Sequence, residues 1–206
     1  ADELVIENSA NAGLSVLSGT SNTGSIFFGD SGDNDIGYIQ YEHGSTNALY
    51  FGANAGTKMA ISADGEVTKP LQPAFAVKPT SNQSDINCVN THVTVVFGTE
   101  IFDIGANFAS NTFTAPVTGK YQLQTNLYLS DFDASADYLQ ADIVTSNNTY
   151  STIWETGSED SYVTLNIACT ADMDASDTAY VRLFQGSGAA QVDIRTAARF
   201  SGHLAC

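Results

Sequence analysis

Basic residues are scarce in this chain. Seven lysines and arginines stand against 23 acidic residues among 206, which gives a formal net charge of −16. A surface this acidic repels nucleic-acid phosphates and anionic lipid headgroups, so we expect no nucleic-acid partner. No apolar run reaches the roughly 20 residues that a membrane-spanning helix needs, so we also expect no membrane insertion. Solubility explains such acidity, and a functional acidic surface that binds cations or glycans stays open as the alternative.

Cysteine is also scarce, and its pattern excludes two classes of small domain. The three cysteines, Cys88, Cys169 and Cys206, are an odd number, which a dense disulfide framework would not leave. No CxxC pair or Cys/His pair has the spacing of metal ligands. Cys169 lies in the alternating run SYVTLNIACT, where we expect a small buried apolar residue. The role of Cys206, at the end of the chain, stays open.

The chain has few histidines and no recognisable catalytic motif. His43, His92 and His203 are isolated in the sequence, and none lies in a GxSxG or HExxH pattern. His203 falls inside the run ARFSGHL, where a structural role in a strand is the simpler interpretation. We therefore expect no enzyme and no catalytic residue.

What the chain does contain is a series of short β-type segments after about residue 70. They are rich in β-branched and aromatic residues, several alternate apolar with polar, and Gly, Asn, Asp and Ser clusters separate them. The runs are TFTAP, VTGKYQLQTNLYLS, DYLQADIVT, YSTIWET, SYVTLNIACT, TAYVRLFQ and QVDIRTAARFSGHL. This regular spacing of short strands and turns predicts an all-β, antiparallel β-sandwich or jelly roll.

One stretch, FGTEIFDIGANFASNTFTAPVTGKY, has a more specific pattern. An aromatic residue is followed after five residues by Asp and after four more by an aromatic, and a later Phe precedes Gly-x-Tyr by five. The residues in these places are Phe97, Asp103, Phe108, Phe113, Gly119 and Tyr121. The spacing resembles the motif of the C1q globular head, with the gap between Phe108 and Phe113 two residues short. Asp103 and Gly105 are typical of turns.

The resemblance extends from about Leu71 to Cys206. DTAYVRLFQGSG is similar to the penultimate strand of that family, and ARFSGHL is similar to its closing strand. The C1q head is a trimeric jelly roll similar to tumour necrosis factor. The resemblance therefore implies a jelly-roll head in residues 70–206 and a homotrimer.

The first 69 residues have a different pattern. GLSVLSG, GSIFFGD, IGYIQYEH, NALYFGAN and TKMAISADG recur about every eleven residues, and each contains or is followed by Gly, Asp or Asn. So little apolar material in each unit cannot close a core within one chain, whereas a stack shared among chains can. The prolines of TKPLQPAFAVKP indicate an extended connector, so we place the boundary between residues 69 and 70.

This segment resembles the shaft repeats of bacteriophage tail fibres and tailspikes, which precede a terminal domain. The resemblance implies a short, interwoven, trimeric β shaft over residues 1–69. The residues that carry it are Gly24, Ser25, Ile26, Phe28, Gly29, Asp30, Ser31, Asp33, Asn34, Asp35, Ile36, Gly37, Ile39, Tyr41, Asn47, Leu49, Phe51, Met59, Ile61, Asp64, Gly65 and Val67.

Two acidic loops, DSGDNDIG and SDFDASAD, place several oxygen ligands close together, as Ca²⁺ requires. We name Asp131, Asp133 and Asp137 of the second loop as candidate ligands. Neither loop matches the twelve-residue calcium loop, because no Gly follows a D-x-[DN]-x-[DN] run, and a turn-forming role for these residues stays open. We expect no required cofactor, with calcium as the one option.

Aromatic residues beside polar loops are typical of sugar-binding and protein-binding surfaces. The candidate receptor-binding residues are Phe132, Asp133, Tyr138, Tyr150 and Trp154. Trp154 is the only tryptophan, and burial in the sandwich core is its alternative interpretation.

Together these patterns predict a homotrimeric phage fibre tip that binds a host cell-surface glycan or protein. Its location would be the virion, on a tail fibre or other appendage exposed to the extracellular medium. A structural trimerisation cap or capsid decoration protein is the first alternative, and a polysaccharide-degrading tailspike fragment is the second. The chain begins at Ala1, and we expect a fragment or a processed form.

Overall fold

The computed structural model describes residues 4–157 and 161–206. These residues form strands, turns and loops, and among them no helix is long and apolar enough to cross a membrane. The chain divides into two compact units, unit 1 from Ala1 to Leu71 and unit 2 from Gln72 to Cys206. The proline-rich connector places the sequence-based boundary two residues earlier, at 69/70.

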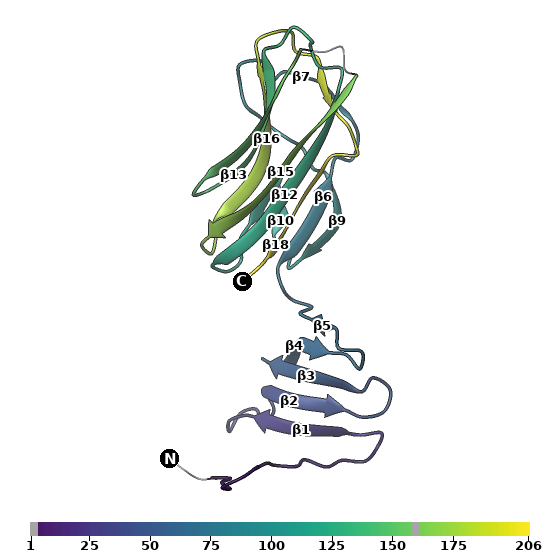
Figure 1. Cartoon of the computed structure of the whole chain (residues 1–206), viewed down its shortest axis with the longest axis vertical. Coiled ribbons are helices and arrows are strands. Elements are labelled where there is room, and N and C mark those ends of the chain that lie inside the picture. The colour runs from purple at the N-terminus through teal and green to yellow at the C-terminus, as the bar shows by residue number, and fades with distance from the viewer. Residues whose placement is uncertain (1–3, 158–160) are drawn as a thin grey trace. The chain divides into compact units, whose positions relative to one another are not determined.

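Unit 1 is a single antiparallel sheet with strand order β1-β2-β3-β4-β5 (Figure 1). Its strands are β1 (Thr23–Phe28), β2 (Gly37–Glu42), β3 (Ala48–Ala53), β4 (Gly56–Ile61) and β5 (Val67–Thr68). Asn54 and Ala55 join β3 to β4 with positive φ at both residues, as a tight two-residue hairpin requires. Each strand pairs with its sequence neighbour in the same chain, so the sheet forms without strands from another chain.

Unit 1 has almost no interior of its own. Ala48 is the one buried residue among those described in the unit, and the large apolar residues of the strands are half-buried or exposed. A one-layer sheet has two faces and no second layer to cover either of them.

Unit 2 is a sandwich of two antiparallel sheets, in which the jelly-roll fold predicted from the sequence is confirmed (Figure 1). One sheet has the order β10-β11-β16-β13-β14, with β8 also paired to β16. The other has the order β7-β17-β12-β18-β6-β9, with β15 also paired to β12. The strands are β6 (Ala74–Lys78), β7 (Gln83–Ile86), β8 (Val93–Thr94), β9 (Thr99–Ile104), β10 (Phe108–Ala109), β11 (Thr112–Thr114), β12 (Gly119–Ser130), β13 (Tyr138–Thr145), β14 (Thr149–Glu155), β15 (Tyr162–Met173), β16 (Thr178–Gly186), β17 (Val192–Ile194) and β18 (Arg199–Leu204).

The alternation of apolar and polar residues in β12 and β15 orients these strands. Tyr121, Leu123, Leu127 and Leu129 of β12 are fully buried and Thr125 is buried on the same side, while Gln122, Gln124, Asn126 and Tyr128 alternate with them and face outward. The two strands pair over twelve residues, so their apolar sides join the same core. Phe75 of β6 packs in that core against the rings of Phe108, Phe113 and Phe200, with centroids 4.6–5.3 Å apart.

Asp103 fixes the turn that follows β9. Its Oδ1 accepts the amide of Asn107 at 3.1 Å, and its Oδ2 accepts the amide of Phe108 at 2.8 Å. Gly105, within this turn, has a φ of 94°, which a residue with a side chain rarely adopts. The carboxylate is therefore structural, as the sequence pattern predicts for this position.

The cysteines differ from expectation at one position. Cys88 is fully buried, whereas Cys169 is half-buried rather than buried, because β15 lies at an edge of its sheet. Burial raises the pKa of each of these two thiols to about 11, so both are protonated and unreactive at neutral pH.

Candidate functional site

The loop between β12 and β13 contains most of the candidate residues proposed from the sequence. Asp133 is held at the centre of this loop: one carboxylate oxygen accepts the amide of Ser135 at 2.8 Å, and the other accepts the amide of Ala189 at 2.5 Å. The bond from Ala189, followed by those from Ser135, lowers the pKa of Asp133. Asp133 therefore ties the 131–137 loop to the loop that follows β16.

The two other candidate calcium ligands, Asp131 and Asp137, lie in the same loop and are exposed. Within the described parts of the chain, no group of three or more His, Cys, Asp or Glu side chains is arranged to hold a metal ion. One backbone amide already donates to each carboxylate oxygen of Asp133, so this side chain has a structural role in the loop. Calcium binding by Asp131, Asp133 and Asp137 stays a prediction.

Two of the aromatic candidates at this end of the sandwich, Phe132 and Trp154, point inward. Phe132 is only 6% exposed, and the ring of Trp154 meets it edge-on with centroids 4.9 Å apart. Trp154 packs against the hydrophobic core, which is the alternative interpretation that the sequence left open. Tyr138 stacks on Phe184 with centroids 5.7 Å apart. Much of the surface of these rings is therefore taken by the protein itself.

Tyr150 lies toward the other end of β14, about 13 Å along the strand from Trp154 at roughly 3.3 Å per residue. Its hydroxyl donates to the carbonyl oxygen of Thr170 at 3.5 Å. The structure thus brings Phe132 and Trp154 into contact beside Asp133. Tyr138 lies on the opposite side of the sheet from Trp154, because its neighbour Leu139 is the residue that pairs with Trp154, and Tyr150 lies apart along β14.

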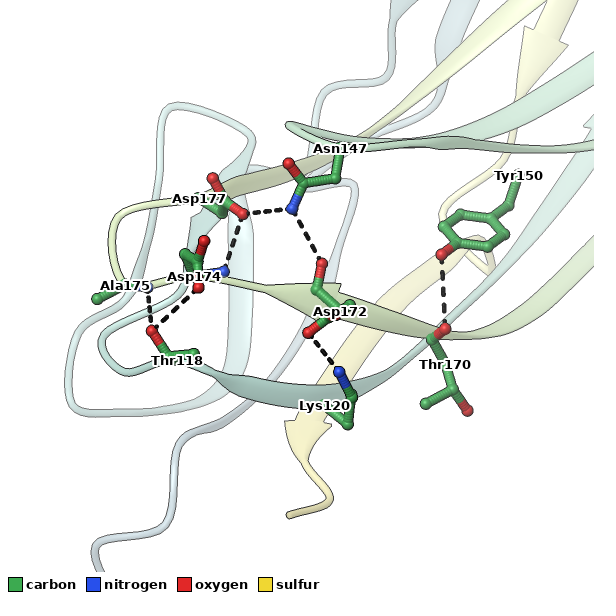
Figure 2. A network of polar contacts seen from close by, with 9 residues as sticks. All are labelled: Thr118, Lys120, Asn147, Tyr150, Thr170, Asp172, Asp174, Ala175 and Asp177. Atoms are coloured by element: carbon green, nitrogen blue, oxygen red, sulfur yellow. Dashed lines mark hydrogen bonds and ion pairs between the residues drawn. The ribbon is translucent and has the colours of Figure 1, made fainter.

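A polar network ties the loops together at that other end of the sandwich (Figure 2). The Asn147 side-chain amide donates to Asp177 at 2.7 Å and to the carbonyl oxygen of Asp172 at 3.1 Å. Asp177 also accepts the amide of Asp174 at 2.9 Å, and Lys120 pairs with Asp172 at 2.6 Å. These carboxylates form turns and join strands, so their clustering has a structural explanation.

A second candidate surface, which the sequence analysis did not predict, is the outward face of the sheet that contains β15, β12, β18 and β6. We call it the amide face, because amides and hydroxyls dominate it. Two depressions of about 440 and 330 Å³ lie along it, and both are lined by Gln124 and Ser201. Its central outward residues are Gln122, Gln124, Asn126, Thr164, Asn166, Ala168, Thr170, Arg199, Ser201 and His203.

The amide face has no carboxylate among these central positions, although the chain carries a net charge of −16. Its side chains bond to one another across strands: Gln124 donates to Ser201 at 3.2 Å, and Thr170 donates to Gln122 at 3.0 Å. His203 lies in the closing strand β18, as the sequence pattern predicts, and its side chain is exposed on this face. The alternation of β18 turns it outward, toward the lining of the smaller depression.

A model of the C1q domain matches residues 74–205, which is more than half of the chain. The chain belongs to the C1q domain family. The match confirms the resemblance seen in the spacing of Phe97, Asp103, Phe108, Phe113, Gly119 and Tyr121. It starts at residue 74 and so assigns no family to the residues before it.

One solved structure supports this fold. The chain is similar to the globular domain of zebrafish complement 1qA protein, with 18% identity and a TM-score of 0.50; the match covers 66% of this chain and 98% of that one. It is also similar to murine APRIL at pH 5.0, with 13% identity and a TM-score of 0.47, over 65% of this chain and 98% of that one. No curated protein sequence matches the chain.

The C1q domain of this chain accommodates its short gap between Phe108 and Phe113 with a tight hairpin. Phe108 pairs directly with Phe113, and Ala109 pairs with Thr112. Ser110 and Asn111 form the two-residue turn, with φ of 51° and 66°. Both aromatic side chains remain buried, so the loss of two residues leaves the core intact.

Proposed function

We propose that this chain is the tip of a homotrimeric viral fibre, as on a phage, which attaches the virion to a host cell-surface glycan or protein. The observation that carries the proposal is the pairing of a C1q domain with a one-layer β unit that has no core of its own. Such a unit gains a core only when several chains associate. Three linked heads then multiply weak receptor contacts by avidity.

The amide face supports the homotrimer. Chains that each carry −16 repel one another, and association is least costly through a surface whose central positions carry no carboxylate; Asp172, at the end of the same face, is paired with Lys120. The face also offers side-chain donors and acceptors that a neighbouring copy can satisfy. Membership of the C1q family favours the same oligomer.

For the receptor-binding surface we retain the 131–137 loop and Trp154, and we add two exposed residues. Tyr162 is 54% exposed and pairs with Ser130, directly before the loop. Ile153 is 58% exposed and precedes Trp154 in β14. These side chains have more free surface than Phe132, which is buried.

A structural trimerisation cap or capsid decoration protein is the second candidate. The inward packing of Phe132 and Trp154 favours it, because rings held in the core offer little area to a receptor. The third candidate, a polysaccharide-degrading tailspike fragment, has no catalytic motif in the sequence to support it.

The experiment that tests the proposal is binding of the fluorescently labelled chain to a panel of bacterial cells and purified glycans, with light scattering on the same sample. We expect a trimer that binds saturably to some cells and leaves their surface polymer intact. The Tyr162→Ala and Ile153→Ser variants should weaken binding, and Val117→Ser, an exposed residue between β11 and β12, is the matched control. A trimer without binding would favour the structural cap, and loss of surface polymer would favour the tailspike.

A further inference from the structure

The strand register of unit 1 sorts its side chains onto two different faces. On one face Ile26 lies opposite Ile39, Ile39 opposite Phe51, and Phe51 opposite Met59. The next row on the same face joins Tyr41, Leu49, Ile61 and Val67. We call these residues, with Phe28 at the end of β1, the apolar face.

The opposite face carries the polar residues Ser25, Gln40, Glu42 and Thr68 together with the aromatic residues Phe27, Tyr38 and Tyr50. Its central row runs Ser25, Gln40, Tyr50, Ala60 and Thr68 across the five strands. An antiparallel sheet normally packs its more apolar face on a core and leaves the other in water. The apolar face of unit 1 therefore requires a covering layer.

The described residues of unit 1 do not provide that layer. Ile26 is 43% exposed, and Phe28 and Val67 are each 57% exposed. The extended segment before β1 approaches the sheet near Gly24 through Val16 and Ser18, and Val16 lines a depression of about 290 Å³ together with Ile26 and Ile39. That segment exposes apolar side chains of its own, including Leu17 at 91%, so it adds apolar surface instead of covering it.

We propose that the apolar face packs against the apolar faces of other copies of this chain, so that complete sheets, each formed by one chain, share a single core. The two apolar rows contain no Asp, Glu, Lys or Arg; Asp30, Asp33 and Asp64 lie outside the strands, and Glu42 of β2 lies on the opposite face. Identical faces can therefore meet without burying a carboxylate, despite the charge of −16 on each chain.

The size of the face indicates how this contact is maintained. Four inter-strand spacings and strands of six residues give roughly 20 Å by 20 Å, on the order of 400 Å² per chain. Stable interfaces between free proteins bury about 800 Å² per partner, so this face is too small to hold two untethered chains together. A face of this area can hold the copies together when a second contact between the chains keeps them at high local concentration. The inference thus rests on the proposed homotrimer of the C1q domain.

The test places a photo-crosslinker on each face of the full chain. Phe51→p-benzoylphenylalanine puts the probe on the apolar face, and Tyr50→p-benzoylphenylalanine, the adjacent residue of β3, is the matched control on the opposite face. Circular dichroism and light scattering on each variant establish that the fold and the mass are unchanged. We expect Phe51 to give on the order of ten times more inter-chain product than Tyr50, because the probe reacts only with atoms in contact. The crosslinked peptides should come from residues 26–61 of another copy.

Three results would overturn the inference. Crosslinks from position 51 to residues 4–17 of the same chain would show that the N-terminal segment covers the face. A trimer with equal, low inter-chain crosslinking at both positions would show that the faces do not meet, and the proposed homotrimer would stand without this contact. A monomer by light scattering would remove the homotrimer and this inference together, so the two failures are distinguishable.

Discussion

Asp142 is the residue whose environment is most unusual for its type. Its carboxylate is fully buried in β13, where it accepts hydrogen bonds from Arg182 at 2.7 Å and from Gln140 at 2.8 Å. His92 lies 3.6 Å away. Desolvation alone would raise the pKa of Asp142, but the bonds from Gln140, Ser151 and Arg182 together lower it below its ordinary value of 3.8. This carboxylate is charged in the folded protein at neutral pH.

Replacing Asp142 by Asn should destabilise unit 2 by about 3 kcal/mol, because it leaves Arg182 without its partner in a largely buried site. Urea denaturation followed by circular dichroism measures the change. Asp172→Asn is the matched control: this aspartate is 73% exposed in its pair with Lys120, and its loss should cost less than about 1 kcal/mol. Equal effects of the two substitutions would contradict the interpretation.

The same residue predicts a pH dependence. Because the folded pKa of Asp142 is lowered, the stability it contributes is present above the ordinary value of 3.8 and is lost as the pH falls through the lower folded pKa. We expect the gap in unfolding free energy between the wild type and Asp142→Asn to be large at pH 7 and to shrink below pH 3.8. Urea titrations at pH 7 and pH 3 provide the comparison, and a gap that grows in acid would disprove it.

The strands of unit 1 and unit 2 differ in whether the same chain covers their apolar side, and this difference determines where a new charge should destabilise the protein. In unit 2 the alternation of β12 and β15 buries one side of each strand within the same chain. In unit 1 the alternation of β2 and β3 places Ile39, Leu49 and Phe51 on one face, yet the described residues of the unit leave that face partly exposed. A charge on the apolar face of unit 1 therefore tests the contacts between chains.

Ile39→Asp should make unit 1 at least about ten times more sensitive to protease, because a carboxylate would be buried unpaired where the chains meet. Gln40→Asp adds the same charge at the next residue of β2, on the opposite face, and should change the cleavage rate little. Limited proteolysis with mass spectrometry measures both rates and should recover residues 72–206 intact. Similar rates for the two variants would mean that the apolar face is free in solution.

At the scale of the whole molecule, the two units differ in where their stability comes from. The buried hydrophobic cluster of the described residues lies entirely between Phe75 and Phe200, within unit 2. Among residues 4–71, which the structure describes in unit 1, only Ala48 is buried. Stability independent of other chains is therefore expected of unit 2 alone.

Residues 72–206 should fold when produced without unit 1, with cooperative urea unfolding, because their core is complete. Residues 1–71 produced alone should show no cooperative transition, because a single uncovered sheet of this size is not stable in water. Circular dichroism during urea titration of each fragment checks both expectations. A residue 1–71 fragment that unfolds cooperatively as a monomer would contradict them.

The sequence alone determined the all-β class, the jelly roll of the C-terminal part and the C1q motif, because these depend on local patterns. Alternation orients a strand, and Asp103 and Gly105 fix their turn through bonds and φ angles a few residues away. Only the tertiary structure decided which candidate side chains are accessible. Phe132 and Trp154 pack inward because strands distant in sequence meet there, and Tyr150 lies apart because β14 extends away from the loop. The amide face and the apolar face depend on the pairing register, which sets which outward residues become neighbours, and no single segment of the sequence contains that information.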